Sequence, residues 1–229
     1  MKTFIITGAN GNLGIACVKK FLAEGYKVIA VDGHDNHLEF AAGNPNYEFA
    51  TVNLTSEEET YSFIAGSIKK YGKIDGALML VGGFAAGNIA ATTGADLHKM
   101  FSLNFETVYF MTRPLMEHMQ QNNEGRLIFI GARPSLNPVQ GKDLMAYALT
   151  KSLLFKLAEF INEDCKGKNI TATVIVPSTI DTALNRKSMP DTDPANWVTP
   201  EALADSIEFI ASPKGSVLRE TVLKVYNNS

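Results

Sequence analysis

The chain has 229 residues, of which 45% are hydrophobic and 20% charged, and its formal net charge at pH 7 is −3. This length and apolar content suffice for one sizeable core, so the simplest organisation is a single domain over residues 1–229. The basic residues are dispersed, which excludes the charge pattern of a protein that binds nucleic acid or an anionic membrane. A protein that acts on a small molecule is therefore expected.

Cysteines, histidines and the start of the chain bear on its environment. The first apolar run begins close to Met1 without the pattern of an export signal, and Cys17 and Cys165 are the only cysteines. Both features favour a reduced, cytoplasmic protein over a disulfide-linked one. His34 and His37 lie close together but have no other ligands nearby, so they predict a solvated loop and no metal site.

The chain begins with the pattern of a strand, a glycine turn and a helix. The apolar run 4–6 leads into Thr-Gly-Ala-Asn-Gly-Asn-Leu-Gly at 7–14, which opens a stretch with helical spacing. Gly8, Gly11 and Gly14 allow a tight turn and the close approach of a ligand, and the helix start offers unpaired N–H groups. This environment suits a pyrophosphate, although a glycine turn can also serve only to connect a strand with a helix.

A carboxylate follows the second apolar run. Asp32 closes the run 28–31 and lies 18 residues after Gly14. A carboxylate at this place can accept hydrogen bonds from both hydroxyl groups of an adenosine ribose, and its charge should repel a 2′-phosphate. Asp32 therefore predicts NAD as the cofactor, with NADH favoured over NADPH.

Apolar runs and helical stretches alternate through the rest of the chain. Further strands are expected at 47–52, 75–81, 126–130, 170–176 and 222–226, and helices at 38–42, 56–71, 96–121, 143–164 and 200–212. Ser56 and Glu59 form a predicted capping box. This order predicts an α/β fold, with a Rossmann-type, doubly wound parallel sheet in a single domain and helices on both faces.

Loops after the predicted strands contain further candidate ligand contacts. Gly82 and Gly83 follow the fourth strand, where small residues permit contact between backbone and ligand, and the amide of Asn53 could meet an adenine edge. Asn104 lies among apolar residues of the helix 96–121. A buried amide needs partners, and the simplest interpretation is a core Asn that binds neighbouring backbone.

Tyr147 and Lys151 are four residues apart in the helix 143–164, so they share one face. A phenol, with a pKa of about 10, is a poor acid or base at neutral pH, but a neighbouring ammonium group stabilises the phenolate and lowers this pKa. Lys151 can also reach ribose hydroxyl groups. Because both residue types are common in helices, an incidental pair is the alternative.

Together these residues resemble the short-chain dehydrogenase/reductase family over essentially the whole chain. The turn 7–14, Asp32, Asn104, the pair of Tyr147 and Lys151, and the segment 177–182 occur in the family's order. The resemblance implies an NAD-dependent oxidoreductase. It implies cofactor contacts from Gly8, Asn10, Gly11, Asn12, Leu13, Gly14, Asp32, Asn53, Leu54, Gly82, Gly83, Tyr147, Lys151, Pro177, Ile180 and Thr182.

The resemblance also implies roles and partners. Tyr147 would donate a proton, Lys151 would tune the tyrosine, and Asn104 would hold a water molecule of the proton relay. Ile180 and Thr182 would orient the nicotinamide carboxamide. Family members usually associate through their two long helices, so a homodimer or homotetramer is expected.

One catalytic position departs from the family pattern. The usual Ser, thirteen residues before the Tyr, falls at Pro134, or at Ala132 if the loop has a short insertion. Ser135 is the nearest hydroxyl group. A missing oxyanion donor can slow reduction of a carbonyl group by a factor on the order of 10²–10³, so an electron-poor ring is a more favourable substrate than a simple ketone.

The segments 81–88 and 181–197 resemble the dihydropteridine reductases of this family. The resemblance implies reduction of a quinonoid dihydropterin, with Phe84, Ala132 and Ser135 near the substrate and a substrate loop at about 183–198. The second segment also resembles loops of bacterial reductases with other substrates. Two alternatives stay open: a carbonyl or alcohol oxidoreductase, of the ketone or 3-oxoacyl type, that uses Ser135, and an NAD-binding sensor without turnover.

Overall fold

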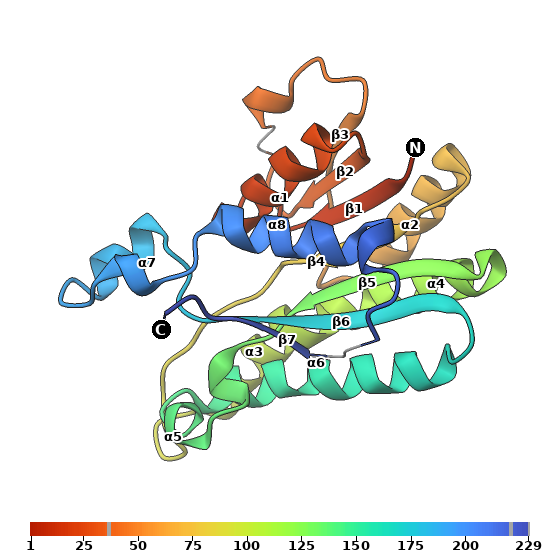
Figure 1. Ribbon diagram of the computed structural model, residues 1–229. Helices are drawn as coiled ribbons and strands as arrows, with labels where there is room; N and C mark the ends of the chain where they lie inside the picture. The colour runs from red at the N-terminus through yellow and green to blue at the C-terminus, as the bar shows by residue number, and fades with distance from the viewer. Residues whose placement is uncertain (36–37, 220–221, 229) are drawn as a thin grey trace.

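The computed structural model describes residues 1–35, 38–219 and 222–228. In this part of the chain a seven-stranded sheet has the order β3-β2-β1-β4-β5-β6-β7, and every neighbouring pair is parallel (Figure 1). Its strands are β1 (Thr3–Thr7), β2 (Lys27–Asp32), β3 (Tyr47–Thr51), β4 (Gly76–Met79), β5 (Glu124–Ile130), β6 (Asn169–Pro177) and β7 (Val222–Val225). The predicted parallel α/β fold is confirmed.

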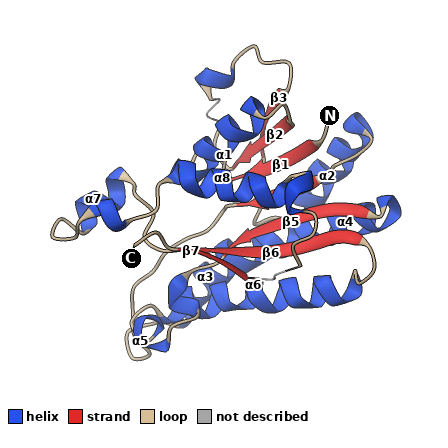
Figure 2. Ribbon diagram, viewed as in Figure 1, coloured by secondary structure: helices blue, strands red, loops and turns tan. Residues whose placement is uncertain are grey.

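Helices cover both faces of the sheet (Figure 2). One face carries α2 (Glu57–Tyr71), α4 (Thr107–Asn122) and α6 (Met145–Asp164), and the other carries α1 (Asn12–Ala23) and α8 (Pro200–Ala211). Successive strand residues point to opposite faces of the sheet, so a hydrophobic core lies on each face. Ile5 packs in the core on the side of α2, α4 and α6, while Phe4 and Ile6 pack in the core on the side of α1 and α8. No helix in the described residues is both long and apolar enough to cross a membrane.

The predicted helix 96–121 has three parts. The helix α3 (Gly94–Phe101) passes into a π-helical turn over Ser102–Glu106, and α4 continues from Thr107. A π turn widens the helix locally and rotates the side chains that follow it. Asn104 lies in this turn and is fully buried, so the irregularity coincides with a polar residue in an otherwise apolar interior.

Two local predictions need correction. β4 ends at Met79 and not at residue 81, because the Leu80 amide donates to the Thr7 hydroxyl at 3.0 Å instead of continuing the ladder. The hydroxyl of Ser56 accepts the Glu59 amide as predicted, but the Glu59 carboxylate accepts the Asn53 amide at 3.3 Å and does not close the capping box. Both differences arise where strands run into loops at the carboxyl edge of the sheet.

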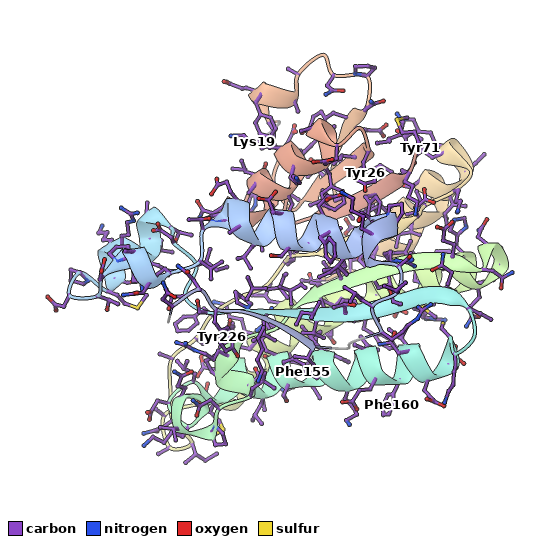
Figure 3. All side chains as sticks on the ribbon, viewed as in Figure 1. Lys19, Tyr26, Tyr71, Phe155, Phe160 and Tyr226 are labelled. Carbon is purple, nitrogen blue, oxygen red and sulfur yellow. The ribbon has the colours of Figure 1, made fainter. Side chains whose placement is uncertain are left out.

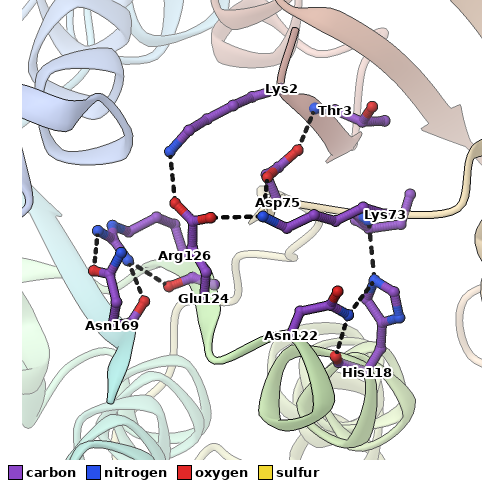
Figure 4. A network of polar contacts seen from close by, with 11 residues as sticks. Lys2, Thr3, Lys73, Asp75, His118, Asn122, Glu124, Arg126 and Asn169 are labelled. Carbon is purple, nitrogen blue, oxygen red and sulfur yellow. Dashed lines mark hydrogen bonds and ion pairs between the residues drawn. The ribbon is translucent and has the colours of Figure 1, made fainter. Parts of the chain in front are cut away.

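A polar network occupies the opposite, amino edge (Figure 4). Lys73 Nζ lies 3.1 Å from Asp75 Oδ1 and 2.6 Å from Glu124 Oε2, and Lys2 Nζ lies 3.0 Å from the other oxygen of Glu124. Hydrogen bonds from Lys73 and Lys2 lower the pKa of Glu124 to about 2. These ion pairs join the starts of strands β1, β4 and β5. Ligand contacts are therefore expected at the other, carboxyl edge of the sheet, where such folds bind ligands.

Candidate active site

The glycine turn between β1 and α1 forms the first wall of the site. Gly8 has a φ of +63°, a left-handed conformation that favours glycine. A Cβ atom on Gly14 would lie 2.1 Å from the Gly8 carbonyl oxygen, so the helix packs against the turn more closely than any other residue permits. Gly11 is the N-cap of α1 and provides no side-chain cap. The first amides of the helix therefore suit an anionic ligand group.

Asp32 lies at the end of β2, beside this turn. Its Oδ2 accepts the Asn10 amide at 3.1 Å, and its Oδ1 lies 3.8 Å from His34 Nδ1. The side-chain oxygen of Asn10 is buried and has no partner among the described residues. A glycine cradle, an uncapped helix start, a carboxylate and an orphaned acceptor together fit a dinucleotide, whose ribose hydroxyl groups are donors.

The predicted histidine pair is only partly visible, because His37 lies outside the described residues. His34 is in the loop after β2 with its side chain 94% exposed. Among residues 1–35, 38–219 and 222–228, no group of three His, Cys, Asp or Glu side chains could hold a metal ion.

Asn104 connects three segments. Its Oδ1 accepts the Gly83 amide at 2.8 Å, and its Nδ2 donates to the Thr150 hydroxyl at 3.2 Å. A Cβ atom on Gly82 would lie 2.8 Å from Asn104 Oδ1 and 3.1 Å from Lys151 Nζ. The amide and the ammonium group thus meet at the same glycine. The side chain binds neighbouring backbone, as predicted, and a proton-relay role stays a prediction.

Lys151 is 5% exposed, and its Nζ donates to the Ile130 carbonyl at 2.7 Å. No carboxylate in the described part of the chain pairs with it, and burial lowers its pKa to about 8. Tyr147 lies one turn earlier in α6, where burial raises its pKa to about 12. This is the opposite of the predicted fall in the pKa of Tyr147, because desolvation dominates and the ammonium group is directed to the Ile130 carbonyl.

An aromatic ring lies over this tyrosine. The segment after β4 crosses to the start of α6, where Gly87 donates to the Asp143 carbonyl and the Met145 amide donates to Gly87, both at 2.8 Å. The crossing brings the ring of Phe84 to 5.2 Å from the Tyr147 ring, edge to face at 63°. Phe84 is 66% exposed. An exposed ring beside a phenol is suited to a flat, partly apolar ligand.

The loop after β5 has no hydroxyl group where it leaves the strand. Ala132 is buried and precedes a 3₁₀ turn over Arg133–Ser135, in which the Ser135 amide donates to the Ala132 carbonyl at 3.0 Å. The loop thus folds back on itself. The Ser135 hydroxyl oxygen is buried and has no partner in the described residues.

The segment after β6 forms a loop closed at its neck. Ile180 and Val198 form an isolated bridge, and within the loop lie α7 (Ala183–Ser188) and a 3₁₀ turn at Pro194–Asn196. Thr182 caps α7 by accepting the Asn185 amide at 3.1 Å. Its hydroxyl proton is left to donate to another group.

The structure brings the predicted site residues to one edge of the sheet, at the loops that follow six successive strands. The glycine turn follows β1, Asp32 ends β2, Asn53 and Leu54 follow β3, Gly82 to Phe84 follow β4, Ala132 and Ser135 follow β5, and Pro177, Ile180 and Thr182 lie at or after the end of β6. Asn53 Oδ1 accepts the Thr55 hydroxyl at 2.7 Å and the Thr55 amide at 3.2 Å, which leaves only its NH₂ group for an adenine. Thr150 was not predicted, because a buried Thr within a helix has no pattern of its own.

A glycine cradle, a carboxylate at the end of β2 and a cluster of half-buried Tyr147 with buried Lys151 and Asn104 at the carboxyl edge fit a dinucleotide-binding oxidoreductase site of the Rossmann class. The family model for short chain dehydrogenases matches residues 2–193. The chain belongs to the short-chain dehydrogenase/reductase family, and it is an oxidoreductase with a nicotinamide cofactor.

Similar proteins include enzymes with different substrates. The uncharacterized oxidoreductase YvrD of Bacillus subtilis is 25% identical over 98% of this chain and 94% of its own length. The dihydropteridine reductase of Dictyostelium discoideum is 26% identical over 90% of this chain and 86% of its own length. A crystal structure of 3-ketoacyl-(acyl-carrier-protein) reductase from Brucella melitensis, complexed with NADH, has the same fold, with a TM-score of 0.85 and 22% identity over 98% of this chain and 96% of that one.

Proposed function

We propose that this protein is an NADH-dependent reductase of an electron-poor conjugated ring, with a quinonoid dihydropterin as the substrate. The observation that carries the proposal is the combination of a half-buried Tyr147, an exposed Phe84 beside it, and Ala132 where the family has a hydroxyl group. A ring that already accepts electrons readily does not need a second hydrogen-bond donor. The likeness to a dihydropteridine reductase supports the same substrate.

When bound, the reduced nicotinamide is the source of the hydride. Burial keeps the pKa of Tyr147 at about 12, so its phenol is protonated at neutral pH and can donate a proton to a ring nitrogen of the acceptor. One hydride and one proton convert the quinonoid dihydropterin to the tetrahydropterin. Lys151 offers positive charge to the phenolate that is left, and Asn104 fixes the backbone at Gly83 and holds water for reprotonation.

Asp32 supports the preference for NADH. Its carboxylate is held by the Asn10 amide at the end of β2, where it can accept hydrogen bonds from ribose hydroxyl groups. Asp32→Ala removes these acceptors and the repulsion of a 2′-phosphate. We expect the ratio of kcat/KM for NADH to that for NADPH to fall at least about tenfold, and an unchanged ratio would refute the assignment.

A carbonyl reductase is the second candidate, because the Ser135 hydroxyl is buried and without a partner in the described residues. This hydroxyl group could supply the hydrogen bond that a ketone or 3-oxoacyl substrate needs. An NAD-binding sensor has less support, because a protein that binds NAD without turnover does not need an ammonium group and a phenol placed for proton transfer.

Initial rates of NADH oxidation test these candidates. Purified protein is assayed with quinonoid dihydropterin and with a panel of ketones and 3-oxoacyl thioesters, for the wild type and for Ser135→Ala. Turnover of the pterin that changes less than about threefold in Ser135→Ala supports the proposal. Turnover of a ketone that is faster than turnover of the pterin, and that falls by a factor of about 10² or more in Ser135→Ala, supports the carbonyl reductase instead.

Association of two or more copies is part of the proposal. The outer faces of α4 and α6 expose Tyr109, Leu149, Leu153 and Phe160, and Figure 3 shows Phe160 on the side of α6 away from the sheet while Phe155 lies toward it. An exposed apolar face of this kind suits a second copy of the chain. Cys17 and Cys165 are buried free thiols, which supports a cytoplasmic location.

A further inference from the structure

The chain after β7 contacts the start of the substrate loop. The Ser178 amide donates to the Val225 carbonyl at 3.1 Å, and the Ser178 hydroxyl donates to the Tyr226 carbonyl at 2.8 Å. Ser178 directly follows β6 and precedes the bridge between Ile180 and Val198. The last described residues are therefore attached to one end of the loop neck.

Asn227 contacts the other end of the same loop. Its Nδ2 donates to the Trp197 carbonyl at 2.9 Å and to the Ala195 carbonyl at 3.2 Å. The residue has a φ of +54°, a left-handed conformation that Asn tolerates better than most side chains. The Trp197 side chain is 3% exposed, so this end of the loop is anchored in the interior. One exposed amide thus reaches across to two backbone carbonyls of the loop.

The segment after β7 also contacts the loop that follows β5. The Arg133 guanidinium lies over the Tyr226 ring, 5.6 Å from its centroid, and Arg133 directly follows the buried Ala132. Figure 3 marks Tyr226 near the carboxyl end of β7, beside the strand end from which the substrate loop begins. Residues 225–227 therefore link the loop after β5 with both ends of the loop after β6.

We propose that Asn227 is a positioning residue that clasps the neck of the substrate loop, residues 183–198, and so fixes the orientation of the loop beside the site. The proposal rests on the proposed function, together with the expectation that residues 183–198 form the loop that covers the bound substrate. With the clasp intact the loop is held ready for binding, and without it the competent arrangement is less populated. The apparent affinity for substrate then falls in proportion to that population.

Two variants with the same change of charge test the clasp. Asn227→Asp keeps the shape of the side chain but replaces the donor with a carboxylate that faces two carbonyl oxygens. Asn228→Asp is the matched control, because the Asn228 side chain makes no hydrogen bond within the described residues. Asn227→Gly retains the positive φ without the donor and serves as a second variant if the aspartate disturbs folding.

Limited proteolysis reads the loop directly, without any need for activity. Arg186 and Lys187 lie exposed in α7, and trypsin can cleave after them only when this short helix unfolds, which happens more often when the loop is less firmly attached. We expect cleavage at these two residues to be about fivefold faster in Asn227→Asp than in the wild type or Asn228→Asp. A thermal midpoint close to that of the wild type ensures that the folded chain is being compared.

Steady-state kinetics then distinguish a loss of loop positioning from a general loss of the folded, active enzyme. In Asn227→Asp we expect KM for the acceptor to rise about fivefold while kcat changes less than about twofold. Equal cleavage rates in all three proteins, equal acceleration in both aspartate variants, or faster cleavage with an unchanged KM would each overturn the proposal. If the wild type turns over no acceptor, the proposed function fails, and the cleavage rates still decide whether Asn227 holds the loop.

Discussion

Lys151 is the residue whose placement most directly affects both chemistry and stability. Its ammonium group is buried with a single carbonyl partner and without a carboxylate in the described residues. Burial of a charge in this way destabilises the folded state, since the unfolded chain solvates it fully.

This burial predicts a pH-dependent stability. The folded-state pKa of Lys151 is about 8, below its ordinary value of 10.5, so between these values the folded chain binds fewer protons than the unfolded chain. Stability must then rise with pH across this window. From about pH 7.5 to about pH 9.5, the free energy of unfolding of the wild type should gain about 1–2 kcal/mol relative to Lys151→Met in urea denaturation. A constant difference between the two proteins would show that Lys151 is not buried as a charge.

For single residues, the sequence predicts a role where the distance along the chain to other motif residues is informative. Gly14, Asp32 and the pair of Tyr147 and Lys151 could be assigned to one site because together, in this order, they resemble the family pattern, whereas the spacing of each alone left an alternative open. The direction of the pKa shift of Tyr147 could not be predicted, because it depends on how far burial outweighs the neighbouring charge. Asn227 was not predicted either, since its partners are backbone carbonyls of a distant loop.

At the scale of elements, the contact between α1 and the glycine turn sets the shape of the cofactor cradle. Gly14→Ala would place a methyl group 2.1 Å from the Gly8 carbonyl oxygen. We expect a loss of about 2 kcal/mol in the free energy of unfolding and much weaker binding of NADH, because the helix must move away from the turn.

Gly66→Ala is the matched control within a helix. Gly66 lies exposed in α2, and a Cβ atom there meets nothing within 4 Å. This variant should be more stable by about 0.5–1 kcal/mol and bind NADH normally. Chemical denaturation and NADH fluorescence titration measure both effects. Similar results for the two variants would contradict the close packing at Gly14.

Most elements could be predicted because their patterns are local. Apolar runs and the turn residues between them place all seven strands and the long helices. What could not be predicted depends on contacts between elements. The π turn at Asn104 carries the buried amide that binds Gly83 and Thr150, and β4 ends early because the Thr7 hydroxyl captures the Leu80 amide. Neither the π turn nor the early end of β4 leaves a periodic pattern of apolar residues in the sequence.

At the scale of the whole molecule, stability and chemistry are assigned to opposite edges of the sheet. The amino edge is held by ion pairs around Glu124, and the carboxyl edge carries the glycine cradle, the catalytic cluster and the substrate loop. Loops at the carboxyl edge can therefore vary without disturbing the strand starts.

Association through the outer face of α6 is a prediction at the same scale. Leu153→Asp places a charge in the middle of this exposed apolar face, so the oligomer should dissociate at least about tenfold more readily. Light scattering coupled to size-exclusion chromatography measures the mass. Val217→Asp is the control, since Val217 is 81% exposed but lies outside α4 and α6. An unchanged mass for Leu153→Asp would place the interface elsewhere, and a monomeric wild type would refute association.

Donation of a proton by Tyr147, in a reaction driven by NADH, is the step on which the proposed function depends. The most direct test compares the wild type with Tyr147→Phe, measuring kcat with quinonoid dihydropterin and the Kd for NADH by fluorescence. Since Phe keeps the ring packed beside Phe84 but lacks the acidic hydroxyl, we predict that kcat falls by about 10²–10⁴ while NADH still binds. A Tyr147→Phe variant that turns over the pterin at the wild-type rate would contradict the account.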